Sequence, residues 1–373
     1  MRSSAWIVAF AVGVSSAAGA QEFRPKGSGI PAADVERAIQ KGMDWLKGMP
    51  PKSGVPTSRM DDTNELVLYT LLHGGLAPSD PALGEFLKRT VDREPDRVYN
   101  VALGAMALAK LDRAGYQWKL VQQGQFLLDN QCENGQWAYG TPVDPARAPG
   151  DWVSWKGAPY GAKYPPGFRP GGPKTTSGRK IGIVQRSRAS KVGDNSNAQY
   201  AALGLRACVE ADLVIDPRCI ADALKWWEND QNKDGGWGYS RGEDDGPRAT
   251  MTAGGVGSLV IYRWMLHKPW ADEAHVKKGM EWLDANPKVS KWQEYYFYGL
   301  ERIGMLYGTD RIGSIDWFDK GAGWLIEHQA ANGSWRNVPD TCFAILFLRR
   351  ATAPLPSVAS VARPPVPQQE ADK

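Results

Sequence analysis

The chain has 373 residues, 42% of them hydrophobic and 23% charged, which suits one large globular domain rather than a disordered or fibrous protein. Its 45 basic and 41 acidic residues nearly balance, and no nucleic-acid recognition motif accompanies them, so we expect no nucleic-acid partner. The four cysteines are too few and too scattered for a disulfide scaffold. Cys208 and Cys219 flank a helical junction and would either pair in an oxidising compartment or remain buried thiols.

The N-terminus has the features of an export signal. Arg2 precedes the apolar run 6–14, and the small residues 18–20 follow it. Residues 1–20 therefore predict a signal peptide cleaved before Gln21, with an uncleaved anchor as the alternative, and an exported protein in the periplasm or outside the cell. Residues 21–32 form an N-terminal extension, and no later stretch is long and apolar enough to predict a membrane-spanning helix.

Two kinds of helical run alternate along the rest of the chain. Amphipathic runs, which we expect on the outside of the domain, cover 33–47, 81–91, 117–130, 217–230, 272–285 and 317–328. Runs that are more apolar all round, which we expect inside, cover 63–72, 98–111, 196–210, 250–265, 294–307 and 341–350. Each outer run is followed by an inner run, so the chain predicts six helical hairpins.

One phrase recurs at three of the junctions between an outer and an inner run. It consists of Gln, three residues, Gly, one residue and Trp, and its copies are Gln131, Gly135 and Trp137; Gln231, Gly235 and Trp237; and Gln329, Gly333 and Trp335. We expect the glycine to adopt the left-handed conformation that ends a helix. The Gln amide can fasten the following turn, and the Trp can bury its ring against the hairpin.

These three copies resemble the QW repeats of the terpenoid cyclase and protein prenyltransferase superfamily. That superfamily has an α/α-toroid fold, and six hairpins are what a closed (α/α)6 ring requires. The resemblance implies an all-α, (α/α)6 toroid over 33–352, as one domain. Because the motif is structural in the superfamily, it indicates a fold and not a reaction.

Two segments depart from the repeat. Residues 141–193 are rich in Gly and Pro and carry ten Lys or Arg against two Asp, with aromatic residues interleaved. This basic insertion in the third hairpin is either a lid over one end of the ring, able to meet an anionic ligand, or a surface excursion. Residues 353–373 are Pro-rich without an apolar face, and we expect a disordered tail.

Polar residues near the starts of the inner runs form the candidate ligand-binding set. In a ring of hairpins the inner helices run in one direction, so their N-termini meet at one end of the central cavity, where their dipoles favour negative charge. Capping of the helices explains many such residues equally well. The set is Asn100, Asp194, Asn195, Asn197, Glu294, Tyr295 and Asp340.

The segment 59–63, which reads Arg-Met-Asp-Asp-Thr, resembles the DxDDT box that supplies the general acid of class II terpene cyclases. The resemblance implies that Asp61 and Asp62 are catalytic, although Arg59 stands at the first acidic position and would favour their ionised forms. The segment 338–344 resembles the prenyltransferase helix that carries a zinc-binding histidine, but Asp340 occupies that position. We therefore assign no metal ligands and no cofactor.

Four functions remain open from the sequence. The first is a binding protein for an apolar or isoprenoid-type small molecule held in the central cavity. The second is a terpene cyclase-like enzyme that uses Asp61 and Asp62 as its acid. The third is a glycan hydrolase or lyase, which requires two carboxylates across an open groove. The fourth is a scaffold that binds protein partners through its outer surface, for which the sequence points to no particular residues.

Overall fold

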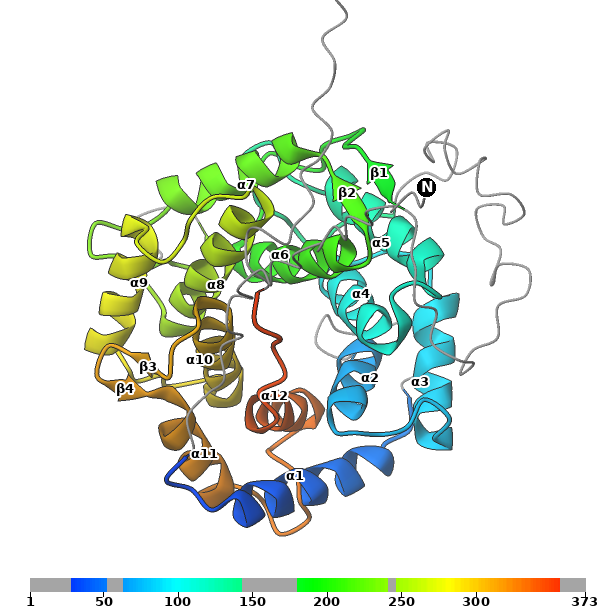
Figure 1. Ribbon diagram of the computed structural model, residues 1–373, viewed down its shortest axis with the longest axis vertical. Coiled ribbons are helices and arrows are strands. Elements are labelled where there is room, and N and C mark those ends of the chain that lie inside the picture. Colours follow the sequence, from blue (N-terminus) through cyan, green and yellow to red (C-terminus); the bar gives the residue numbers. More distant parts are fainter. Residues whose placement is uncertain (1–27, 52–62, 143–179, 241–245, 356–373) are drawn as a thin grey trace, which may run out of the picture.

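The computed structural model describes residues 28–51, 63–142, 180–240 and 246–355, and within these ranges the chain is almost entirely helical (Figure 1). The outer helices are α1 (Ala32–Lys47), α3 (Pro81–Asp92), α5 (Gln117–Asp129), α7 (Pro217–Asn229), α9 (Ala274–Ala285) and α11 (Trp317–Glu327). The inner helices are α2 (Asn64–His73), α4 (Val98–Asp112), α6 (Asn195–Glu210), α8 (Ala249–Met265), α10 (Gln293–Tyr307) and α12 (Val338–Leu348).

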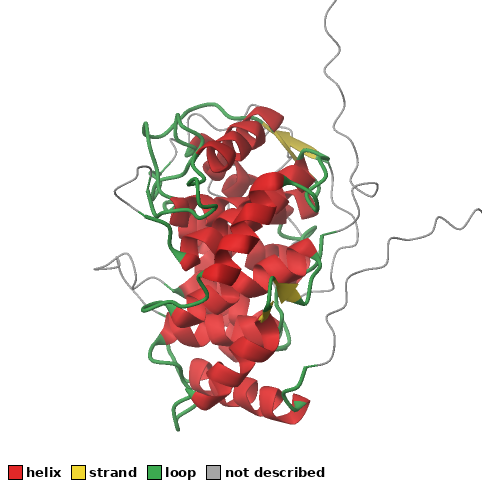
Figure 2. Cartoon of the chain, turned by 90° about the vertical axis from the view of Figure 1, so that its left-hand side faces the viewer, coloured by secondary structure: helices red, strands yellow, loops and turns green. Residues whose placement is uncertain are grey.

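The inner helices form a closed ring. Each contacts the next in chain order, from α2 through α12, and α12 returns to contact α2. The outer helices surround this ring (Figure 1), and Figure 2 shows from the side that the connecting loops gather on its two faces. The predicted all-α toroid of six hairpins is confirmed, and the predicted runs match the helices to within three residues at either end.

The two classes of helix differ in how much of their surface is buried. In α12 every residue from Asp340 to Leu348 is buried, because the helix packs on neighbours all around. In α1 the buried residues, such as Ile39, Met43 and Leu46, recur at helical spacing on one face. Uniformly apolar runs therefore fold inside and amphipathic runs cover them, except that every residue of the outer helix α5 is buried.

The three motif copies connect neighbouring hairpins through hydrogen bonds. In each copy the Gln side-chain amide donates to the carbonyl of the motif Gly and to a backbone carbonyl in the first turns of the next outer helix. The second acceptors are Cys219 for Gln131, His275 for Gln231 and Ala38 for Gln329, at 2.8–2.9 Å. The motif therefore holds two hairpins in register, an interaction between parts of the chain far apart in sequence.

The motif glycines cannot be replaced without strain. Gly135, Gly235 and Gly333 have φ of 94°, 99° and 90°, as expected for a left-handed helix end. A Cβ atom on Gly135 would lie 2.4 Å from the carbonyl oxygen of Asp222 in the next outer helix, and the other two glycines face the same kind of contact. Each motif Trp donates from Nε1 to a carbonyl ten residues earlier; the acceptors are Leu127, Trp227 and Leu325.

Four short strands complete the described part of the fold. β1 (Ile181–Ile183) pairs in parallel with β2 (Leu213–Ile215), and β3 (Arg311–Ile312) pairs antiparallel with β4 (Ile315–Asp316). Part of the predicted insertion, within residues 180–193, bonds to the outer helix α5: Arg186 pairs with Asp129, and the Gln185 side chain donates to the carbonyl of Leu128. The predicted signal peptide, the residues Asp61 and Asp62, positions 143–179 of the insertion and most of the predicted tail lie outside the described residues.

Two further observations bear on the sequence expectations. All four cysteines are buried thiols, and Cys208 and Cys219 are not bridged. Among the described helices, none combines the length and the apolar character needed to cross a bilayer.

Candidate functional site

A cavity of about 510 Å³, here called the mouth cavity, opens at the end of the ring where the inner helices begin. Every inner helix contributes a residue from its first turns or from the residues just before it. The lining consists of Thr63, Leu66, Arg97, Tyr99, Asn100, Tyr139, Ser196, Asn197, Tyr239, Arg248, Thr250, Met251, Trp292, Tyr295, Pro339 and Phe343. The predicted end of the ring therefore contains a real cavity, of a size common for small-molecule sites.

The walls of the mouth cavity are mainly aromatic. The rings of Tyr295 and Phe343 meet edge to face with centroids 5.3 Å apart. Four further aromatic side chains line the cavity: Tyr99, Tyr139, Tyr239 and Trp292. The charged groups among the described lining residues are Arg97 and Arg248, and these residues include no carboxylate. Such a surface suits an apolar ligand and offers no described acid or base.

Three residues of the predicted set lie in the lining. Asn100 donates to Glu65 at 2.7 Å, and Tyr295 accepts through its hydroxyl from Gln199 at 2.7 Å. Asn197 donates from Nδ2 to Asp194, while its Oδ1, in a side chain only 2% exposed, has no hydrogen-bond partner. Of these three residues, Asn197 therefore offers a buried acceptor oxygen to a ligand.

Two other residues of the predicted set have structural roles. Asp194 caps α6 by accepting from the backbone N–H of Asn197. Burial raises its pKa, although hydrogen bonds from Asn197 and neighbouring groups oppose that change. Asn195 is fully buried; its Oδ1 accepts from Trp226 and Gln136, and its amide donates to Asp230. It ties the motif turns of two hairpins together and lies outside the lining.

The last two predicted residues, Glu294 and Asp340, form a buried carboxylate pair beside the cavity wall. Arg336 bridges them, with Nη2 2.9 Å from Glu294 and 3.1 Å from Asp340. Burial raises the pKa of Asp340 to about 6, and the charge of Glu294 adds to this effect. The lining residues Pro339 and Tyr295 adjoin the pair in sequence, but neither carboxylate lines the cavity.

The sequence reasoning did not select several lining residues. Arg97 and Arg248 directly precede α4 and α8, and arginine is not a residue expected at a helix N-cap. Tyr139 and Tyr239 each follow a motif Trp by two residues, and their hydroxyls lie 3.3 Å apart. Their matching positions in two motif copies are a signal that could have identified them. Nothing in the sequence marked Trp292 for the left-handed conformation (φ 65°) that it adopts before α10.

The opposite end of the ring holds a second cavity, here called the strap pocket, of about 380 Å³. Residues 351–355, the strap, leave α12 and cross the ring toward α6 (Figure 1). Both oxygens of the buried Glu301 accept from Thr352, one from its backbone N–H at 2.9 Å and one from its hydroxyl at 2.8 Å. Arg206 donates to the carbonyl of Ala353. The chain itself therefore occupies this end.

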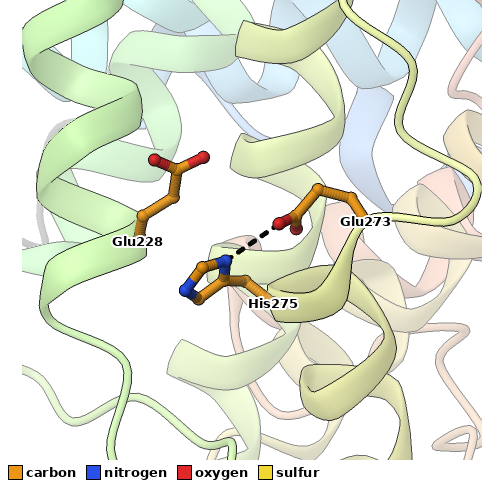
Figure 3. A group of neighbouring side chains, drawn as sticks. All are labelled: Glu228, Glu273 and His275. Atoms are coloured by element: carbon orange, nitrogen blue, oxygen red, sulfur yellow. Dashed lines mark hydrogen bonds and ion pairs between the residues drawn. The ribbon is translucent and has the colours of Figure 1, made fainter.

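One cluster outside both cavities has the composition of a metal site. Ligand atoms of Glu228 in α7 and of Glu273 and His275 at the start of α9 all lie within 4.8 Å of one another (Figure 3). However, Arg263 lies between the carboxylates, with Nη1 3.1 Å from Glu228 and 3.8 Å from Glu273. Burial opposes ionisation of Glu273, but hydrogen bonds from His275 and Val276 hold its pKa below the usual range. Because Arg263 already pairs with both carboxylates, we assign no metal to this cluster.

Comparison with known proteins gives the fold and no closer assignment. No family model and no curated protein matches the chain. A variant of the type II terpene cyclase MstE from Scytonema, solved with geranylgeranyl dihydroxybenzoate, aligns over 86% of this chain and 98% of its own at 13% identity and a TM-score of 0.51. A possible member of the GH105 family from Salmonella enterica serovar Paratyphi A aligns over 88% and 96% at 11% identity and a TM-score of 0.50.

The chain thus has an α/α-toroid fold similar to the folds of these two proteins, as the sequence resemblance implied. At these identities the likeness defines an architecture, and the GH105-like neighbour shows that the architecture is shared between different classes of protein. The function has to be argued from the cavity.

Proposed function

We propose that the protein binds an apolar, isoprenoid-type small molecule in the mouth cavity. The observation that carries this proposal is the lining itself: six aromatic side chains with Leu66 and Met251, and no carboxylate among the described lining residues. Each Å² of apolar surface removed from water contributes roughly 25 cal/mol, so a branched hydrocarbon chain gains most of its binding free energy from such walls.

A second function, acid-initiated cyclisation, is favoured by one specific observation. Thr63 lines the cavity, and Asp61 and Asp62 directly precede it in the sequence. In this proposal a protonated Asp62 transfers its proton to an alkene carbon of the ligand, leaving a carboxylate and a carbocation that closes a ring. Loss of a proton from the product cation ends the reaction. Aromatic faces such as those of Tyr99 and Phe343 stabilise a cation near their ring centres.

A glycan hydrolase or lyase has less support. Its chemistry needs two carboxylates facing a bound sugar, and the described lining residues supply none. Four described carboxylates close to the lining have partners of their own: Glu294 and Asp340 pair with Arg336, Glu65 accepts from Asn100, and Asp194 accepts from Asn197. The likeness to the GH105-like protein is a likeness of fold and adds nothing to this chemistry.

The binding proposal is tested by native mass spectrometry of the full chain, titrated with geranylgeraniol and, separately, with an oligogalacturonide. We expect a one-to-one complex with the isoprenoid alcohol and none with the sugar. Binding of the sugar alone would overturn the proposal and favour the glycan hydrolase or lyase. The protein purified from its own host should also be inspected for a retained isoprenoid mass, which would identify the ligand directly.

The cyclase proposal is tested by Asp62→Asn. The neutral amide cannot donate the required proton, so turnover of a polyprenyl substrate should fall at least about a hundredfold, the scale of general-acid contributions. Ligand affinity and the thermal midpoint should stay unchanged. Glu133→Gln, on an exposed residue, is the control for loss of one negative charge. Equal turnover in both variants would remove the cyclase proposal and leave the binding proposal intact.

Export is a separate proposal that depends on residues 1–20 alone. N-terminal sequencing of the protein from its host should begin at Gln21, whereas an intact Met1 would contradict cleavage.

A further inference from the structure

We propose that the strap, residues 351–355, is a latch that closes the end of the ring opposite the mouth cavity and loosens when the Glu301 carboxyl group ionises. The latch lies at the other end of the ring, so it does not depend on the proposed binding function. Three features of the molecule support it: α12 ends independently of the strap, two ring residues hold the strap by hydrogen bonds, and one of them is a buried carboxyl group.

The strap begins after a helix end that is complete without it. Arg350 follows α12 with φ of 46°, the left-handed conformation common at helix ends. The backbone N–H groups of Arg350 and Ala351 donate to the carbonyls of Phe347 and Leu346 in α12, at 2.9 and 3.0 Å. These bonds lie within the helix end and do not require the docked strap. The residues that follow can therefore detach while α12 stays in place.

The strap is hydrogen-bonded to the ring through Glu301 of α10 and Arg206 of α6. Thr352 donates its backbone N–H and its hydroxyl to the two oxygens of Glu301, at 2.9 and 2.8 Å. Arg206 donates to the carbonyl of Ala353 at 2.7 Å. Residues 351–353 also line the strap pocket, so part of the strap borders a cavity of about 380 Å³ instead of packed side chains. A segment held in this way can open locally at a lower cost than global unfolding.

Glu301 is a buried carboxyl group without an ion pair. Its side chain is 0% exposed, and within the described part of the chain both oxygens bond to Thr352 and no cation pairs with them. Both protonation states can keep two bonds, because a protonated Glu301 donates its O–H to the Thr352 hydroxyl. The two states therefore differ mainly in solvation. A carboxylate regains water only when the strap leaves, so ionisation favours the open state.

Other titratable and charged groups act on the same region. Burial raises the pKa of Glu301 to about 7, against hydrogen bonds from Thr352 and the charges of Arg302 and Arg206. His73 acts in the opposite sense, because burial and the charge of Lys110 lower its pKa to about 3, so an open state that exposes it takes up a proton. The groups around Glu301 and the strap are Tyr69 and His73 of α2, Lys110 of α4, Arg206 and Glu210 of α6, Tyr298 and Arg302 of α10, and Arg350 after α12.

The sign of the Glu301 contribution follows from the two states of the strap. The pKa of Glu301 is about 7 with the strap docked and returns to the ordinary value of 4.5 where opening exposes the carboxyl group. Glu301 therefore stabilises docking fully below pH 4.5, and this stabilisation is lost as the pH rises to 7. Over that interval the opening constant of the strap should increase about tenfold per pH unit, or roughly 300-fold in total.

Hydrogen–deuterium exchange of the full chain, resolved to single amides by fragmentation mass spectrometry, measures the opening directly. The Thr352 amide is bonded to Glu301 and reports the strap, whereas the Ala351 amide is bonded to Leu346 within the helix end and is the internal reference. Exchange rates at pH 4.5, 6, 7 and 8, each divided by the intrinsic rate at that pH, give the opening constant.

We expect the ratio of the wild-type opening constant to that of Glu301→Gln to be near one at pH 4.5 and to reach roughly 300 at pH 8. The Gln amide accepts from the Thr352 N–H, donates to its hydroxyl and does not titrate. The contribution of His73 cancels in this ratio. Thr352→Val removes one bond and should raise the opening constant about tenfold at every pH. Glu210→Gln, which removes another carboxylate of the strap pocket, is the matched control and should leave the pH dependence in place.

Two results would overturn the latch. One is a ratio that stays constant from pH 4.5 to 8. The other is a Thr352 amide that exchanges as slowly as the buried amides of α10, because the strap would then open only on global unfolding. If Glu301→Gln does not fold, His73→Gln takes its place: it removes the opposing titration, so its opening constant should rise with pH, and a flat profile would refute the role of Glu301.

Discussion

The two ends of the ring are built from the same six inner helices, but the cavities at the two ends have different linings. At the helix starts, the mouth cavity presents aromatic side chains and two arginines. At the helix ends, the strap pocket is lined by groups of both signs, including Lys110, Arg206 and Glu210, and Thr352 of the chain itself extends into it. Among the described residues, the chain itself fills space at the end with the strap pocket, whereas the mouth end keeps an open cavity.

The dipoles of the inner helices distinguish the mouth end of the ring from the end with the strap pocket. Basic residues near helix ends, such as Lys110 in α4, stabilise the negative pole of the dipole, so the strap pocket needs no external charge. At the mouth, Arg97 and Arg248 stand at the N-termini of α4 and α8, where the positive pole of the helix dipole disfavours a cation. A protein under no functional demand would be more stable with capping residues there.

The largest effect we expect from a single substitution is at the strap. Burial raises the pKa of Glu301 to about 7, against hydrogen bonds from Thr352 and the nearby charges of Arg302 and Arg206. A raised folded-state pKa stabilises the protein fully below the unfolded value of about 4.5, and this stabilisation is lost as the pH rises through 7. Glu301→Gln mimics the protonated form, so at pH 8 it should increase the unfolding free energy by about 3 kcal/mol.

Urea denaturation of both proteins at pH 4.5, 6 and 8 measures this effect. The gain in Glu301→Gln should be near zero at pH 4.5 and largest at pH 8. The difference between the two proteins is the relevant quantity because other groups titrate as well: burial and the charge of Lys110 lower the pKa of His73 to about 3, which gives the opposite slope. Ligand affinity at the mouth should not change. A variant less stable than wild type at pH 8 would contradict the assignment.

A smaller effect is expected at Trp292, where one substitution should maintain or raise the unfolding free energy and should weaken ligand binding. This residue lines the mouth cavity, is 47% exposed and has φ of 65°, a conformation that costs a residue other than glycine about 1 kcal/mol. Trp292→Gly should therefore fold at least as stably as the wild type, by up to about 1 kcal/mol, yet bind an isoprenoid about tenfold more weakly, since it loses an aromatic contact.

The matched control is His267→Gly, at the C-terminal end of α8, where φ is 55°. Relief of the same backbone strain should raise its unfolding free energy similarly, while ligand affinity stays at the wild-type value. Denaturation and calorimetry on the three proteins separate the two contributions. Equal loss of affinity in both glycine variants would mean that Trp292 acts through stability and not through contact with the ligand.

Much of the fold followed from the sequence because its signals are local. Apolar residues at helical spacing marked the six hairpins, and a Gly four residues after a Gln marked three helix ends. The hydrogen bonds that connect one hairpin to the next could not be predicted from such local patterns. Gln131, for example, donates to Cys219, 88 residues away, and only the assembled ring brings the two together.

Only part of the candidate site could be predicted from the sequence, again because sequence patterns are local and the site is assembled from distant residues. Asn100, Asn197 and Tyr295 lie in the lining because the starts of all inner helices meet at one end. Arg97 was not predicted because arginine is not among the residues that cap helix N-termini. Residues 353–355 of the strap were predicted to belong to a disordered tail because Pro-rich sequence lacks an apolar face. Their attachment depends on Arg206, which lies 147 positions before Ala353 and donates to its carbonyl.

The smallest expected effect tests whether the mouth recognises its ligand through ring faces or through hydroxyl groups. Tyr139 and Tyr239 come from equivalent positions after two motif copies, and their hydroxyls are 3.3 Å apart near the surface. Tyr139→Phe removes one exposed hydrogen bond and keeps the ring, so the unfolding free energy should change by less than about 1 kcal/mol. If ring faces dominate, isoprenoid affinity should change by less than about threefold. A loss well beyond that, measured by calorimetry against wild type, would show that the Tyr139 hydroxyl itself contacts the ligand.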